Sequence, residues 1–158
     1  MGKKSVKENK SIYQTIREEL NLTREQAAEL LDVISENKLV KIENGTTPPR
    51  AEDILIMAKQ YKRPDLCNYY CSNECPIGQK HVPSIKLNNL AQITMGLLAS
   101  FNSIQSYQNR LIEITADGLI SEDEYDDFQS IQKILNAMSV SISEIKLWVD
   151  NAEAKKNI

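Results

Sequence analysis

The chain is poor in the residues on which most catalytic and membrane-embedded sites depend. It has one histidine, His81, and only five glycines. It therefore offers neither a Ser–His–Asp set nor a glycine-rich phosphate loop. No uninterrupted apolar stretch approaches the ~20 residues that cross a bilayer, and the lysines near the N-terminus precede no apolar segment, unlike a secretory signal. We therefore expect a cytoplasmic protein that is not an enzyme.

A strong positive charge is also missing. The 158 residues carry a formal charge of -3, with 41% apolar and 26% charged residues, which is an ordinary soluble balance. Residues 1–66 hold 12 basic and 11 acidic residues, whereas residues 67–158 hold 7 and 11. The basic excess gathers in Lys3, Lys4, Lys7 and Lys10. These lysines predict either a mobile arm that follows phosphates or a solubilising tail.

The stretch from Thr23 to Gly45 predicts two short helices around a tight turn. Thr23 can N-cap the first helix, and Gln26 stands three residues later as in a capping box. Ser35 can N-cap the second helix, which we expect over residues 36–42. Both helices have an apolar side that faces inward, formed by Ala27, Ala28, Leu30, Leu31, Leu39 and Ile42. This arrangement is typical of a helix-turn-helix unit.

This stretch resembles the Cro/repressor-type helix-turn-helix family, often called the XRE family, over roughly residues 10–66. The residues that carry the resemblance are Thr23, Glu25, Ala28, Glu29 and Leu31, followed by the close Ile42-Glu43-Asn44-Gly45. One departure is Asp32, which stands where the family has a turn glycine, in a turn that is one residue longer than usual. The resemblance implies a lambda-repressor-like domain of five short helices that binds DNA.

The outward side of the second predicted helix is where such a domain reads bases. We expect Asn37, Lys38 and Lys41 to reach base edges. Glu36 lies beside them, and its carboxylate repels phosphate but can accept a hydrogen bond from cytosine N4. The residues expected to hold phosphates are Arg24, Ser35, Asn44, Thr46 and Arg50. The alternative, favoured by Glu36 and the net negative charge, is a protein-interaction module that kept the fold but no longer binds DNA.

All three cysteines, Cys67, Cys71 and Cys75, lie in one segment, with His81 close by. Their spacing places the sulfurs on one side of a helix, but it matches no strong zinc or iron–sulfur motif. We favour packing, since cysteine is among the most buried residue types. A zinc or iron–sulfur site and a redox switch are the alternatives. The order of segments in this chain is similar to that of regulators in which a Cys-containing segment and a helical tail follow the helix-turn-helix domain. This resemblance implies no role for the cysteines.

After Pro83 the sequence changes to heptad repeats. The first segment has one seam of Leu90, Leu97, Ile104 and Leu111, and another of Ile93, Tyr107 and Ile114. The second segment has seams of Phe128, Leu135, Ile142 and Val149, and of Ile131, Met138 and Ile145. Gly118 can end the first helix, and Ser121 with Glu124 can cap the second. We therefore expect an antiparallel hairpin of two helices of about 30 residues each.

The expected fold is all-α. A helix-turn-helix domain with a basic arm covers residues 1–66, a Cys-containing connector residues 67–86, the hairpin residues 87–152, and a disordered tail residues 153–158. Two hairpins would bury both seams in a four-helix bundle, which favours a homodimer; the alternative is a hairpin that packs back on its own domain. The predicted function is sequence-specific binding of double-stranded DNA by a dimeric repressor that occludes a promoter.

Overall fold

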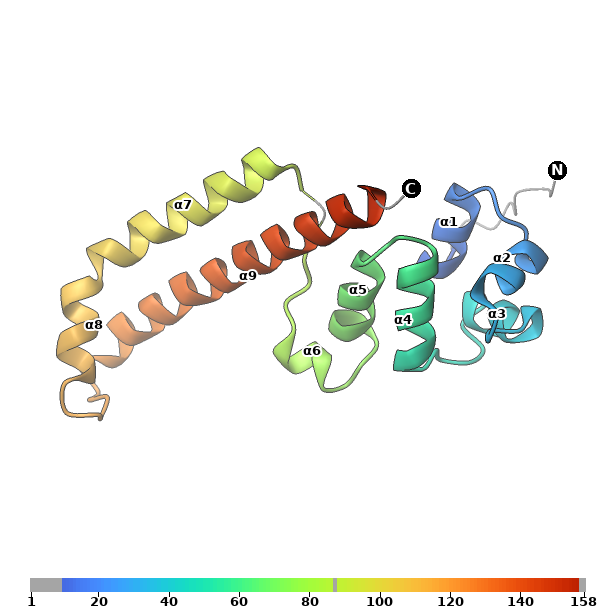
Figure 1. The fold of residues 1–158 in the computed structure, drawn as a ribbon. Coiled ribbons are helices and arrows are strands. Elements are labelled where there is room, and N and C mark those ends of the chain that lie inside the picture. Colours follow the sequence, from blue (N-terminus) through green and yellow to red (C-terminus); the bar gives the residue numbers. More distant parts are fainter. Residues whose placement is uncertain (1–9, 87, 157–158) are drawn as a thin grey trace. The chain divides into compact units, whose positions relative to one another are not determined.

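A computed structural model describes residues 10–86 and 88–156, and within these ranges all regular structure is helical. The predicted all-α fold is thus confirmed. The chain divides into two compact units, one of residues 1–82 with 153–158 and one of residues 83–152. The ribbon in Figure 1 has short helices in the first unit, whereas the second unit contains the two longest helices of the described residues. Lys3, Lys4 and Lys7 of the predicted arm lie outside the described residues.

The first unit begins with short helices whose ends are fixed by local hydrogen bonds. They are α1 (Ile12–Glu19), α2 (Arg24–Leu31), α3 (Glu36–Glu43), α4 (Ala51–Gln60), α5 (Asp65–Asn73) and α6 (Gly78–His81). Thr23 Oγ1 accepts from the Gln26 amide at 3.1 Å, and Gln26 Oε1 accepts from the Thr23 amide at 2.9 Å. The predicted capping box and the predicted start of both central helices are therefore confirmed.

The turn between α2 and α3 is strained at Asp32. This residue has φ 60° and ψ -60°, and the Val33 amide donates to the Leu31 carbonyl across it at 2.7 Å. These values describe a γ-turn with positive φ, which is rare because Cβ crowds the backbone. Ile34, which is fully buried, then anchors the turn in the core. Asp32, which stands where the family has glycine, thus adopts a backbone conformation that glycine reaches without strain.

One apolar core holds the first unit together. It receives Ile16 from α1, Leu31 from α2, Leu39 from α3, Met57 from α4 and Leu66 from α5, each no more than 1% exposed. Full burial of such side chains stabilises a domain by about 1.5–3 kcal/mol each relative to exposure. The core therefore fixes α3 in place along its inner side and leaves its other side for contacts outside the domain.

Helices α5 and α6 belong to this unit, which corrects the prediction of a connector over residues 67–86. Cys67 and Tyr69 pack against the main core from α5. The start of α6 lies against α5 so closely that a Cβ at Gly78 would stand 2.1 Å from the Cys71 carbonyl oxygen. No amino acid except glycine fits there without a backbone shift, so Gly78 allows the two helices to touch. The first unit therefore extends to Val82, beyond the boundary predicted at residue 66.

The second unit consists of α7 (Leu90–Ser106), α8 (Gln108–Thr115) and most of α9 (Tyr125–Lys156). The prediction of one helix of about 30 residues before the loop was wrong, because the helix breaks at Tyr107, whose ψ is 2°. The prediction of a disordered tail was also wrong for residues 153–156, which continue α9. The loop between α8 and α9 has Gly118 at φ 75°, and Glu124 accepts from the Ser121 amide at 3.0 Å.

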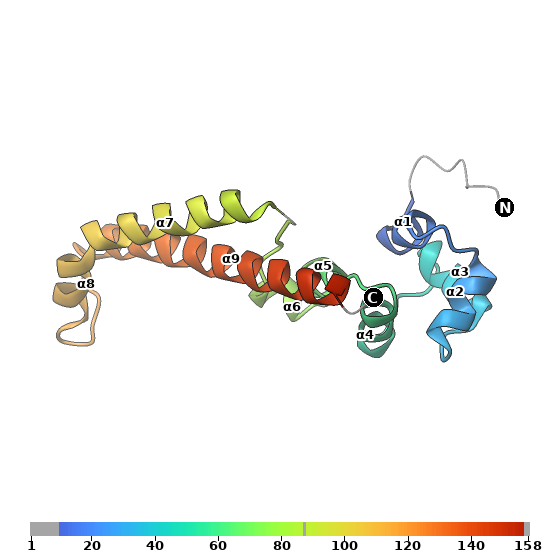
Figure 2. The same cartoon turned by 45° about the horizontal axis from the view of Figure 1, so that its top comes forward.

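Within the second unit, α7–α8 and α9 run antiparallel to each other, as both views show (Figures 1 and 2). Ile93, Ile114 and Ile131 are buried along their contact. Small side chains allow the middle of the pair to come close, because a Cβ at Gly96 would lie only 3.5 Å from Ser141 Oγ. The far end is tied by Arg110 Nε, which donates to Asp127 Oδ2 at 2.6 Å. The unit is thus a helical hairpin with a narrow apolar seam.

Candidate nucleic-acid interface

The outer side of α3 is an exposed polar surface on a helix that the core of the first unit holds in place. Leu39 and Ile42 pin the helix from within, at 0% and 2% exposed. Glu36, Asn37 and Lys41 lie on the opposite side and are exposed. These three predicted base-contacting residues are therefore on one accessible helix face, as major-groove reading requires.

Lys38, the remaining predicted base reader, is already held by another side chain. Its Nζ donates to Asp53 Oδ1 at 2.6 Å, and 36% of the lysine side chain is exposed. Asp53 Oδ2 also accepts from the Arg50 amide at 3.0 Å, which caps α4. Lys38, Asp53 and Arg50 thus form one cluster that fixes the start of α4 against α3. Arg50 itself is exposed beside α3, where a phosphate contact is expected.

A buried carboxylate fixes the other end of α3. Glu43 has a fully buried side chain, and its Oε2 accepts from Arg17 Nη2 at 2.9 Å and from Arg24 Nε at 2.8 Å. The hydrogen bond to Glu43 raises the pKa of the Arg17 guanidinium above its usual value. Arg24, predicted to hold a phosphate, is therefore oriented by Glu43, while a third of its side chain is exposed.

The other predicted phosphate contacts lie at the two ends of α3. Ser35 Oγ accepts from the Lys38 amide at 3.4 Å and caps the helix. Thr46 Oγ1 donates to the Lys41 carbonyl at 3.1 Å, in the exposed loop that follows Gly45. Asn44 is the exposed C-cap residue. The structure thus gathers the predicted residues around α3. Among them, intramolecular hydrogen bonds are made by the side chains of Arg24, Ser35, Lys38 and Thr46.

Two residues that organise this surface were missed by the sequence reasoning. Asp53 positions Lys38, and Glu43 positions both Arg17 and Arg24. Glu43 could have been found, because it follows Leu39 by four residues and therefore lies on the inner side of the helix. A charge at such a position requires a partner. Asp53 carries no comparable signal, because its partner lies 15 residues away.

The cysteine segment offers no comparable site. Cys67, Cys71 and Cys75 are of intermediate exposure. Among residues 10–86 and 88–156, no three side chains of His, Cys, Asp or Glu are grouped so that they could hold a metal ion. The candidate ligands of the zinc or iron–sulfur alternative, Cys67, Cys71, Cys75 and His81, therefore form no such group there.

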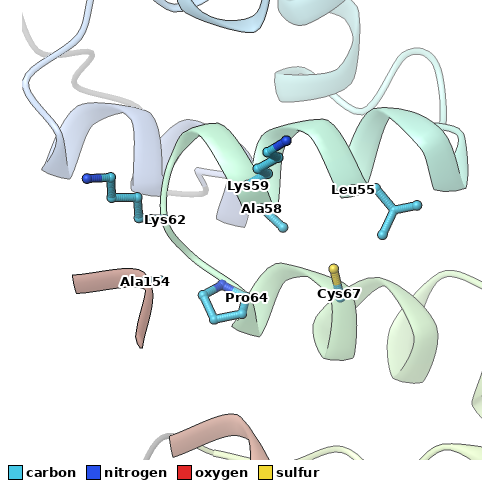
Figure 3. Close-up of a pocket in the computed structure, with 7 residues that line it drawn as sticks. All are labelled: Leu55, Ala58, Lys59, Lys62, Pro64, Cys67 and Ala154. Atoms are coloured by element: carbon cyan, nitrogen blue, oxygen red, sulfur yellow. The ribbon is translucent and has the colours of Figure 1, made fainter. Parts of the chain in front are cut away.

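An open pocket of about 460 Å³ in the first unit is lined by Leu55, Ala58, Lys59, Lys62, Pro64, Cys67 and Ala154. Figure 3 shows Leu55 and Cys67 directed into the space between α4 and α5, whereas the Lys59 ammonium is directed away from it. A small-molecule site typically adds convergent polar groups to such an apolar wall. This pocket lacks them, so the outer side of α3 is the better candidate for function.

The first unit contains a helix-turn-helix, formed by α2, the turn at Asp32 and α3. A family model described as helix-turn-helix matches residues 14–65, which include α2 and α3 in full. This part of the chain is similar to helix-turn-helix domains of the XRE type, which are found in DNA-binding transcription regulators. Neither a curated protein nor a solved structure matched the chain significantly. Within the described residues, no helix is long and apolar enough to cross a membrane.

Proposed function

We propose that this protein is a homodimeric transcriptional repressor that binds a specific sequence of double-stranded DNA. The observation that carries the proposal is the outer side of α3, where Asn37 and Lys41 are exposed on a helix that the core holds rigidly. An asparagine amide pairs with adenine, and a lysine ammonium donates to guanine O6 and N7. Arg50 and Thr46 lie at the edge of this surface, where phosphate contacts fix the register of the helix.

Repression would follow from occlusion of a promoter by the bound protein. A single α3 reads only a few base pairs, and helix-turn-helix proteins extend the site by binding as two-fold dimers. The hairpin is the part of the chain that would join two copies. The proposal assigns no catalytic role and no resident cofactor, places the protein in the cytoplasm with its DNA, and interprets the cysteines as packing residues. Metal analysis of the purified protein tests the interpretation of the cysteines.

The first experiment is selection of bound sequences from a random duplex pool at physiological salt. We expect enrichment of a two-fold site whose half-sites are about one helical turn, ~34 Å, apart. Lys41→Ala should then weaken binding to that site about tenfold and reduce the salt slope by about one phosphate equivalent. The matched control is Lys59→Ala, which removes an exposed lysine from the last turn of α4. No enrichment from folded protein would refute DNA binding.

The second candidate is a protein-interaction module, and Glu36 is the observation that favours it. Its carboxylate is exposed in the first turn of α3, where it would repel a DNA phosphate. Affinity for nucleic acid separates the two functions, because only binding to DNA releases condensed counterions and weakens steeply with salt. Glu36→Gln should strengthen nonspecific DNA binding if α3 enters the groove, and should leave it unchanged otherwise.

A further inference from the structure

One side of the hairpin carries apolar side chains that the hairpin itself leaves exposed. On α9, Leu135, Ile142 and Val149 are 47%, 43% and 41% exposed, and on α7, Leu90, Leu98 and Phe101 are 41%, 52% and 47% exposed. We call these six residues, together with the half-buried Phe128 of α9, the apolar stripe. Four of them, from Phe128 to Val149, recur every seven residues. A continuous apolar surface of this kind marks an interaction site, unlike apolar residues scattered singly.

Helix geometry places both halves of the stripe on the same side of the hairpin. At 100° per residue, the α7 half lies roughly 100° from the buried positions Ile93 and Ser100, and the α9 half roughly 70° from Ile131 and Ser141. Both rotations are clockwise when each helix is viewed from its own N-terminus. The two helices run antiparallel, so from one fixed viewpoint one rotation is clockwise and the other is anticlockwise. Since the buried positions of the two helices face each other, these opposite rotations bring both halves of the stripe to the same side of the hairpin.

This face carries little charge, in contrast to the rest of the hairpin. No Asp, Glu, Lys or Arg occurs between Lys86 and Arg110, so the α7 half contains none. Between the apolar residues of the α9 half lie Gln132, Ser139 and, near Val149, the exposed Lys146. Other charged residues of α9 such as Lys133 and Glu144 lie about 140–180° around the helix from the stripe. The hairpin is therefore polar on one side and carries a single charged residue on the other.

We propose that the apolar stripe is the surface on which a second copy of this chain docks, so that two hairpins form a four-helix bundle. A face whose one charged residue, Lys146, lies at its Val149 end offers little to an acidic or basic partner, whereas a two-fold axis can place the stripe on its own copy with Lys146 near the end of the interface. The α9 half of the stripe, from Phe128 to Val149, is ~31 Å long, and the α7 half, from Leu90 to Phe101, is ~17 Å long. At ~10 Å of width per helix the stripe covers on the order of 500 Å². This is more than half of the ~800 Å² that each partner buries in a stable interface.

The proposal rests on the proposed function, since a two-fold operator needs two copies of α3, and it specifies which face of the hairpin joins them. The bundle would cover Leu135 and Ile142, which the predicted heptads require to be buried. It would also leave the polar side of each hairpin in water. The seam between α7–α8 and α9 would remain as it is in the single chain.

The test is sedimentation equilibrium of the full chain without DNA. We expect the wild-type protein to be dimeric, and Leu135→Glu and Leu98→Glu each to raise the dissociation constant at least ~100-fold, because each buries an unpaired carboxylate at the interface. The control is Asn136→Glu, which adds the same charge at the next residue of α9, exposed and turned away from the stripe. It should leave the dissociation constant within about threefold of wild type.

A monomeric wild-type protein at about 100 μM would overturn the proposal, as would a dimer that tolerates both stripe variants or one that Asn136→Glu weakens equally. Circular dichroism checks that the helices persist. If a glutamate variant unfolds, Leu135→Ala replaces it, with an expected ~10-fold weakening; an unchanged dissociation constant there would also overturn the proposal. Sequence selection separates the two proposals. A dimer that enriches no sequence refutes only DNA binding, whereas a monomer that enriches a single half-site refutes only the docking surface.

Discussion

The helix-turn-helix unit and the hairpin bury their apolar residues to different degrees. In the first unit, Ile16, Leu39 and Met57 are completely buried in a core that five helices of the described chain share. In the hairpin, Ile93, Ile114 and Ile131 form a single line of buried isoleucines, and Leu135 and Ile142 remain more than 40% exposed. The first unit therefore has the interior of an independent domain. The hairpin has the interior of a module that gains stability when a further apolar surface covers it.

Charge is used differently in the two units as well. The first unit buries Glu43 between Arg17 and Arg24, which fixes α3 relative to α1 and α2. The closest ion pair of the hairpin, Arg110 with Asp127, is partly exposed on both sides and therefore contributes little. Buried hydrogen-bonded charges add directional contacts to a core, whereas the contacts of an apolar seam are not directional. The unit that must present α3 rigidly has the more specific interior.

The largest predicted effect is on the buried cluster of the first unit. Glu43→Ala leaves the Arg17 guanidinium buried without its carboxylate and should lower the free energy of unfolding of this unit by about 3–5 kcal/mol. Trp148, the single tryptophan, lies in the hairpin, so its fluorescence follows the second unit. We expect circular dichroism to detect an early transition that Trp148 does not.

The control for that comparison is Glu19→Ala. Glu19 pairs with Arg63, but 56% of its side chain is exposed, so the loss should stay below about 1 kcal/mol. Coincident loss of the circular dichroism and Trp148 signals in Glu43→Ala would contradict the separation of the two units.

The next effect separates the units by function. Asn37→Ala should weaken binding to the selected operator by about 1–3 kcal/mol and relax the preference at one base pair. It should leave dimerisation unchanged, because Asn37 lies in the other unit. Titration of labelled operator measures the first quantity and sedimentation the second. Asn102→Ala, an exposed asparagine of α7 outside the apolar stripe, should change neither, and equal losses in both variants would exclude a specific role for Asn37.

A smaller effect concerns protein concentration. If the hairpin is completed by a second copy, a tenfold increase in concentration stabilises the dimer by about 1.4 kcal/mol. The denaturation midpoint followed by Trp148 should therefore rise with concentration. In the Leu135→Glu variant, the denaturation midpoint of the first unit, followed by circular dichroism, should not change with concentration. A Trp148 midpoint that is independent of concentration would mean that the hairpin is stable as a monomer.

The smallest effect sharpens the description of the first unit. Asp32→Gly should stabilise it by about 0.5–1 kcal/mol, because glycine adopts the positive φ of this turn without strain. Asp32→Ala is the matched control, since it removes the carboxylate but keeps Cβ and therefore the strain. Chemical denaturation of both variants measures the difference. Equal stabilisation by both substitutions would assign the effect to the charge and leave the backbone without a role.

Much of the first unit could be predicted from the sequence because its signals are local. The bonds of the capping box join Thr23 to Gln26, three residues apart, and Ser35 caps the helix that begins at its neighbour. Outward positions of α3 such as Asn37 and Lys41 follow from helical periodicity alone. The break at Tyr107 could not be predicted in this way, because the heptads of Leu90 to Leu111 continue across it without interruption.

The sequence by itself determined the all-α fold, the two central helices with their caps, the resemblance to the XRE family and the two apolar seams. Each depends on contacts within a few residues or on a period along one helix. Only the tertiary structure decided that Lys38 pairs with Asp53, that Glu43 holds two arginines, that the cysteine helix packs into the first unit, and which seam stays exposed. The physical reason is that burial and ion pairing depend on which distant segments meet, and that information belongs to the folded chain.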